Sequence, residues 1–237
     1  DTNANGVLDP AEGTIVLSGG VDISTGLPLQ TQLTAPPGST VVSPITTLLA
    51  ATIDSNPGLT LAESKAKLSE ALGISPSIEV TSYDPLIAAA NNDGRAKEVL
   101  SAGAKVQDTM LQISSLMAPG DATTKSQAAS AVVQALANSV TAGTSINLDQ
   151  SAVVHDLIQQ SATLLGQTVS AQVKDGASQI IAEANQIKTE IVAATGNALE
   201  AAQELSRTQV AGNAVAVVLE QVTAGTVSVA EAAVQSS

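Results

Sequence analysis

The chain has no cysteine, tryptophan or phenylalanine, and its single aromatic residue is Tyr83. The lack of cysteine excludes disulfides, thiolate metal sites and cysteine nucleophiles. Each large aromatic ring would bury roughly 150–250 Å², so a chain without them must build its core from Ala, Val, Leu and Ile. Because small side chains let helices approach closely, we expect an aliphatic core that is thin and extended.

Basic residues are also scarce. The 237 residues carry 9 Lys and Arg against 22 Asp and Glu, a formal charge of −13, and residues 1–60 have no basic residue. A nucleic-acid partner requires a basic footprint and usually stacking aromatics, so we expect none. An acidic surface instead favours solubility and cation binding. No run reaches the ~18 apolar residues of a membrane span, so we expect no transmembrane segment.

Proline is confined to one part of the chain, because all nine prolines lie at or before Pro119. Residues 1–40 are typical of loops and short strands, with extended runs at 14–18 and 27–35. From Val41 the apolar period becomes helical. We therefore expect two units. Residues 1–40 hold a calcium loop, described below, and a short β-segment, and residues 41–237 form a helical domain.

Capping residues mark the expected helices. The N-caps are Ser43, Thr60 (with Glu63), Asp84, Asp121, Asp149, Asn197 and Ser228 (with Glu231), and Gly73 is expected to end a helix. The longest helices are expected over about 95–118, 123–141, 150–165, 168–195 and 197–222. The sequence thus predicts a mainly α fold, an elongated multi-helix array or bundle.

Two of these helices carry apolar seams at spacings of 3 and 4. The first comprises Val99, Ala102, Val106, Met110, Ile113 and Met117, and the second Val173, Ala177, Ile180, Ala184, Ile187, Ile191 and Ala194. The second approaches a coiled-coil heptad, so we expect it to be buried and to form subunit contacts if the protein assembles. The tetrapeptide TAGT occurs twice, at 141–144 and 223–226, and indicates either a duplicated helical unit or chance.

The opening stretch DTNANGVLDPAEG carries the most specific chemistry. It fits the calcium-loop template D-x-[DN]-x-[DN]-G-x₅-E at every specified position. Gly6 permits the sharp turn, and the expected oxygen ligands are Asp1, Asn3, Asn5, Asp9, Glu12 and the Val7 carbonyl. Calcium is therefore the expected cofactor.

The alternative for this stretch is a metal-free turn, which Asn, Asp and Gly form readily. The match at all five specified positions, with Asp9 as a further ligand at loop position 9, favours calcium. Gly13 and the strand-like TIVLS follow Glu12, so the site is not half of a paired sensor. Three carboxylates predict weak binding, in the range of roughly 10⁻⁴–10⁻³ M found in extracellular modules. A ligand at Asp1 also leads us to expect further chain upstream.

Catalytic motifs are not found in the sequence. His155 and Asp156 are adjacent, and neighbouring helical positions point about 100° apart, so they do not form a base–orienter pair. Tyr83 is expected to be a buried ring with a bonded hydroxyl, and Glu200 and Glu204 to lie on a solvated helix face. There is no nucleophile elbow, phosphate loop, H-E-x-x-H or dinucleotide fingerprint. We therefore expect a protein that is not an enzyme.

Residues 1 to about 120 resemble a module of very large secreted bacterial surface proteins, which are repetitive, calcium-dependent and adhesin-like or matrix-forming. The resemblance rests on DTNANGVLDPAEG, GGVDISTGLPLQTQLTAPPGSTVVSPITTLLAA, AESKAKLSEALGI and TSYDPL. In that family Asp/Asn-rich loops bind calcium and stiffen the joints between modules, and the ligands named above occupy those places. The resemblance implies an extracellular location at the cell surface.

Three hypotheses for function follow. The first is a non-enzymatic extracellular structural or adhesive calcium-binding module of a bacterial surface protein. The second is a self-assembling filament or surface-layer subunit, because an isolated two-stranded sheet needs a partner edge from a neighbouring domain or another copy of the chain. The third is a binding protein that holds an apolar ligand in a cavity lined by the seams.

Overall fold

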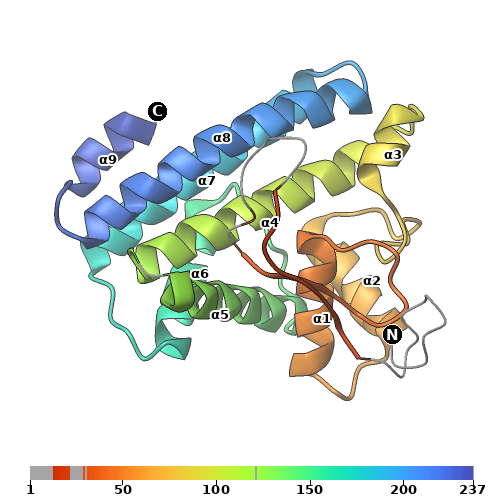
Figure 1. Cartoon of the computed structure of the whole chain (residues 1–237), viewed down its shortest axis with the longest axis horizontal. Coiled ribbons are helices and arrows are strands. Elements are labelled where there is room, and N and C mark those ends of the chain that lie inside the picture. The colour runs from red at the N-terminus through yellow and green to blue at the C-terminus, as the bar shows by residue number, and fades with distance from the viewer. Residues whose placement is uncertain (1–12, 22–28, 30, 121, 237) are drawn as a thin grey trace.

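The computed structural model describes residues 13–21, 29, 31–120 and 122–236 (Figure 1). In this part the chain forms a short two-stranded sheet followed by nine helices. The elements are β1 (Ile15–Leu17), β2 (Leu33–Ala35), α1 (Pro44–Ser55), α2 (Leu61–Leu72), α3 (Pro85–Ala90), α4 (Ala96–Met117), α5 (Ala122–Thr141), α6 (Ser151–Leu164), α7 (Ala171–Ala194), α8 (Ala198–Thr223) and α9 (Val229–Ser236). The prediction of a mainly α chain is confirmed.

The helix ends follow from local hydrogen bonds that the sequence predicts. The Ser43 and Thr60 hydroxyls accept from backbone N–H groups of the first turns of α1 and α2, and the Asp84 carboxylate does the same for α3. Asn197 caps α8 in the same way. These bonds satisfy amide groups that have no partner inside the helix.

The repeated TAGT is a helix stop at both of its positions. Gly143 and Gly225 both have φ of 71°, in the left-handed region that glycine adopts without strain. The following Thr144 and Thr226 amides each donate to a carbonyl in the last turn of the preceding helix, at 3.0 Å in both cases. Both copies therefore end a helix in the same way, and the choice between a duplicated unit and chance stays open.

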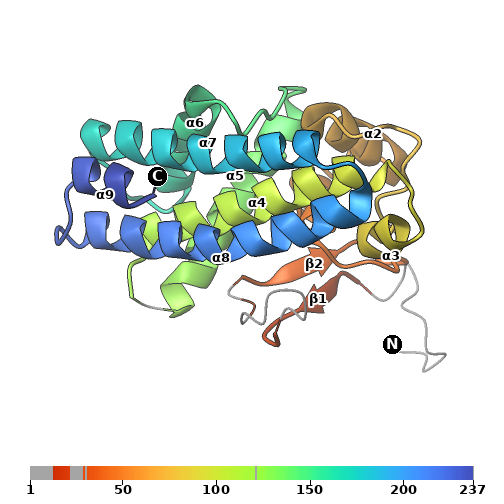
Figure 2. The same cartoon turned by 90° about the horizontal axis from the view of Figure 1, so that it is seen from above.

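Helix α4 is the central element. It contacts α1, α3, α5, α7 and α8, and α7 and α8 run alongside it (Figure 2). Every residue of the first predicted seam is buried, and from Asp108 to Met117 the helix is buried on all sides. Polar residues therefore lie in the middle of the fold, among them Asp108, Thr109 and Gln112.

The second predicted seam is correct only in the first half of α7. Ala177 and Ile180 are buried, but Ile187 is 46% exposed, so the prediction that Ile187 is buried is wrong. The buried face of the second half carries Asn185 and Lys188 instead. Both residues are polar, so a search for apolar periodicity does not find them. They can be buried because they have polar partners on neighbouring elements.

The two strands pair antiparallel, with Ile15 opposite Ala35 and Leu17 opposite Leu33. The other edge of β2 is covered by α1: the Thr34 amide donates to Thr47 Oγ1 at 2.8 Å, and Thr46 Oγ1 donates to the Thr34 carbonyl at 3.0 Å. Within the described part of the chain, the strands are shorter than the predicted runs 14–18 and 27–35. These contacts cross the predicted boundary at residue 40, and the division into two units stays a prediction.

None of the helices in the described ranges combines the length and the apolar composition needed to cross a bilayer.

Candidate functional site

The predicted calcium ligands Asp1, Asn3, Asn5, Val7, Asp9 and Glu12 lie outside the described residues, so calcium binding there stays a prediction. Asp121, the predicted N-cap of α5, also lies outside them. Across residues 13–21, 29, 31–120 and 122–236, no group of three or more acidic or histidine side chains is arranged to hold a metal.

The most unusual chemistry in the described chain is a buried polar cluster where α4, α7 and α8 meet. At its centre, Lys188 Nζ of α7 lies 2.8 Å from Asp108 Oδ2 of α4, and the two side chains are 2% and 3% exposed. They are the only fully buried charged side chains among the described residues. Burial raises the pKa of Asp108, and the nearby Lys188 charge partly opposes that shift.

Helix α8 closes the cluster with its backbone. A β-carbon at Gly212 would lie 2.8 Å from Asp108 Cγ, so only glycine lets α8 approach the carboxylate this closely. The Gln112 amide, one turn along α4 from Asp108, donates to the Gly212 carbonyl at 3.4 Å. The carboxyl group is therefore enclosed between α7 and a bare stretch of α8.

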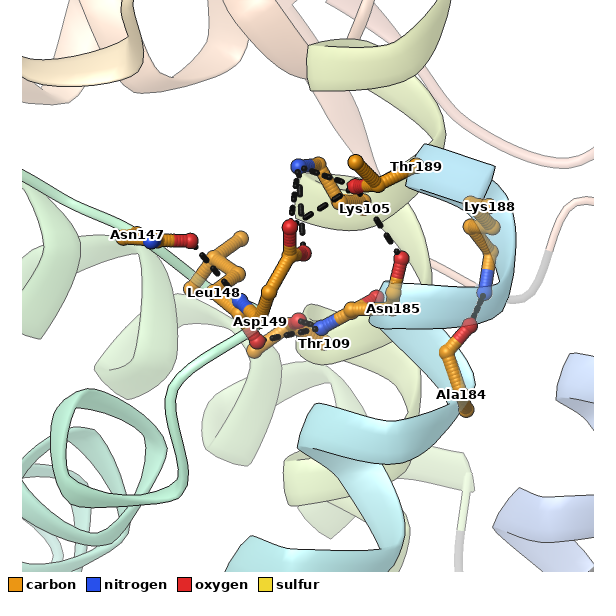
Figure 3. Close-up of polar contacts among 9 residues, drawn as sticks. All are labelled: Lys105, Thr109, Asn147, Leu148, Asp149, Ala184, Asn185, Lys188 and Thr189. Carbon is orange, nitrogen blue, oxygen red and sulfur yellow. Dashed lines mark hydrogen bonds and ion pairs between the residues drawn. The ribbon is translucent and has the colours of Figure 1, made fainter. Parts of the chain in front are cut away.

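Asn185 connects the cluster to the loop before α6 (Figure 3). Its amide nitrogen donates to Thr109 Oγ1 at 3.0 Å and to the Leu148 carbonyl at 3.2 Å. Lys188 also donates to the carbonyl of Ala184, one turn earlier in α7, at 3.0 Å. The Gln112 and Asn185 side-chain oxygens are buried with no hydrogen-bond partner in the described part of the chain.

A second ionic group lies next to this cluster, closer to solvent. Lys105 Nζ contacts the Asp149 carboxylate at 3.1 Å, and the Thr189 hydroxyl donates to the same carboxylate at 2.7 Å (Figure 3). Asp149 was expected to cap a helix, and that prediction is wrong: Gln150 is the N-cap of α6 and makes no side-chain bond to it. A cation and a hydroxyl from two other helices outcompete the local cap bond.

All nine basic residues have internal partners. Lys67 and Lys97 donate to carbonyls at the ends of α5 and α7, where partial negative charge collects. The other seven pair as Lys65–Glu79, Arg95–Asp93, Lys105–Asp149, Lys125–Glu220, Lys174–Gln159, Lys188–Asp108 and Arg207–Glu204. An anionic partner would have to displace one of these contacts, whereas the surplus carboxylates favour cations.

The other candidate residues do not form a catalytic group. His155 on α6 lies 3.5 Å from Asp175 of α7 and 3.7 Å from Asp156, with no nucleophile among these contacts. Tyr83 is half-buried, with the Arg95 guanidinium 5.8 Å from its ring centre. Burial and the adjacent Asp93 raise the pKa of Tyr83 to about 12, so the phenol stays protonated at neutral pH.

A pocket of about 280 Å³ lies between β2, α1, α3, α4 and α8, with Leu33, Ile45, Leu86, Val99 and Leu205 in its lining. Of the residues in the two predicted seams, only Val99 lines this pocket. Ligand pockets typically span ~300–1,000 Å³, so the volume of this pocket lies just below that range. The third hypothesis, an apolar-ligand carrier, stays a prediction.

Comparison with known proteins finds no similarity: no family model, no curated protein and no solved structure matches the chain.

Proposed function

We propose that this chain is a non-enzymatic structural or adhesive module of a secreted bacterial surface protein. A calcium loop at residues 1–12 fixes how the chain enters an elongated array of helices. The observation that carries the proposal is the match of residues 1–12 to the calcium-loop template at every specified position.

The use of charge in the helical region supports a cation-dependent role. Every Lys and Arg is committed to an internal contact, and the charge that remains is acidic. Three carboxylates in the loop repel one another unless a cation lies between them. Binding of calcium neutralises that charge and orders the loop, while the helices keep their own aliphatic core.

Calorimetry tests this proposal directly, on a chain that carries a short extension before Asp1 so that no free amino terminus disturbs the site. We expect one calcium per chain with an affinity in the range of about 10⁻⁴–10⁻³ M. Glu12→Ala removes the bidentate ligand and should weaken binding strongly without changing the helical circular dichroism. Glu183→Ala, an exposed acid on α7, is the matched control and should bind as the unmodified chain does. No uptake at several millimolar calcium would refute the proposal.

A second candidate, a self-assembling subunit, is favoured by the outer strand. β1 pairs only with β2 among the described residues, and Val16 and Leu17 are 55% and 46% exposed. The far edge of β2 is occupied by the Thr46 and Thr47 hydroxyls. A strand can therefore be added only next to β1, from a neighbouring module or another copy.

Light scattering and electron microscopy of the full chain distinguish the two functions. A module stays monomeric at all concentrations, whereas a subunit forms discrete oligomers or fibres. Val16→Pro tests the edge, because proline lacks the amide donor that strand addition needs. The matched control is Val16→Thr, which preserves the strand and should assemble as the unmodified chain does.

A further inference from the structure

We propose that Lys188 and Asp108 condense in the folded protein into an intramolecular isopeptide bond that joins α7 to α4. The inference does not depend on calcium binding or on the proposed function. It rests on the contact between a primary amine and a carboxyl group, 2.8 Å apart, in surroundings that exclude water.

Burial changes the chemistry available to this pair. In water an amine and a carboxylic acid exchange a proton and stop there, because both ions are well solvated. In the buried cluster most of that solvation is lost, and this reduces the advantage of the ionised pair over the neutral acid and amine. The raised pKa of Asp108 has the same cause. The neutral pair is the reactive form, since only an amine with a free electron pair can attack.

The step balances without a cofactor. One proton passes from Lys188 Nζ to the Asp108 carboxylate, which gives a neutral amine and a carboxylic acid. The nitrogen lone pair attacks Cγ and forms the C–N bond. The C–OH bond then breaks, and the hydroxyl leaves with a second proton from the nitrogen as water. The product is a neutral secondary amide, with no oxidation or reduction.

The surroundings fit both the attack and the product. Fixed contact between the two groups replaces a bimolecular encounter, and such positioning reaches effective concentrations of roughly 10⁵–10⁸ M in well-oriented systems. The Gly212 backbone packs against the Asp108 carboxyl group, where a β-carbon would lie 2.8 Å from Cγ, and so holds that group in place beside the amine. The Ala184 carbonyl, which now accepts from Nζ at 3.0 Å, can accept from the amide N–H.

The neighbouring pair of Lys105 and Asp149 is the natural comparison. Its atoms are 3.1 Å apart, but its side chains are 18% and 20% exposed and the carboxylate also accepts from Thr189. Solvent reaches both side chains, so this pair should remain an ordinary salt bridge.

Intact mass measured on the denatured full chain tests the proposal. Protein that has folded should be lighter than its sequence by one water, whereas chain kept in urea from the start should have the full mass until it is refolded. Peptide mapping should recover the segments around residues 108 and 188 as one branched peptide, which locates the bond without any variant. Lys105→Met should keep the loss of water and Lys188→Met should abolish it. Full mass in folded, unmodified protein after prolonged incubation, or a branch at another lysine, would overturn the proposal.

Discussion

Gly212 of α8 lies against the carboxyl group of Asp108 on α4, close enough that a β-carbon at position 212 would overlap Oδ2 and lie 2.8 Å from Cγ. This contact brings α8 onto the buried ionic pair and encloses it. The Asp108 carboxyl group is the reason that position 212 needs glycine. The backbone of Gly212 has ordinary helical geometry, which other residues could also adopt.

Gly212→Ala should therefore destabilise the fold, although alanine is the better helix former. Overpacking of a filled interior costs about 1–3 kcal/mol, and the carboxylate has little room to move. The matched control is Gly103→Ala in α4, where the new β-carbon meets nothing closer than Ile45 Cγ1 at 3.9 Å. The control should gain about 0.5–1 kcal/mol. Urea unfolding of both variants measures the difference, and equal stabilities would refute the packing described.

Ile187→Glu should leave folding intact, because this side chain is 46% exposed on α7. Surface substitutions usually change stability by no more than about 0.5 kcal/mol. Ile181→Glu, on the buried face of the same helix, should prevent stable folding because it places an unpaired charge in the core. Thermal unfolding followed by circular dichroism compares the two, and similar losses in both would contradict the helix orientation.

Thr47→Val should loosen β2 from α1. The Thr47 hydroxyl accepts from the Thr34 amide at 2.8 Å, and valine has the same shape without the oxygen. We expect a loss of about 1–3 kcal/mol, because the part-buried amide is left unpaired. Thr52→Val is the control, since its hydroxyl bonds only to the Leu48 carbonyl within α1. Hydrogen exchange at Thr34 should accelerate in the first variant alone.

The pKa of Asp93 should be about 2, lowered from its ordinary value of 3.8 mainly by hydrogen bonds from the Arg95 side chain and backbone. A lowered carboxyl pKa means that the folded state prefers the ionised form. The resulting stabilisation is present above pH 3.8 and is lost as the pH falls from there to about 2. NMR titration should show the pKa of Asp93 returning toward 3.8 in Arg95→Ala, while the pKa of Glu79, lowered by Lys65, stays low.

Helix ends could be predicted from the sequence because capping involves residues only a few positions apart. Ser43, Thr60 and Asn197 each bond to an amide three residues later, so the sequence contains both partners side by side. Asp149 shows where this reasoning fails. It precedes a helix, as a capping residue does, but a lysine from α4 and a threonine from α7 take its carboxylate.

The sequence by itself determined the mainly helical fold, the N-terminal caps of α1, α2, α3 and α8, and the buried seam of α4, because these depend on local hydrogen bonds and on a period that one helix displays alone. Only the tertiary structure decided which face of the second half of α7 is buried. Lys188 and Asn185 lie there because partners from α4 and from the loop before α6 satisfy them, and those partners are distant in the chain. A lysine is tolerated in an apolar core only when a specific counter-charge meets it, and that meeting depends on how the helices pack.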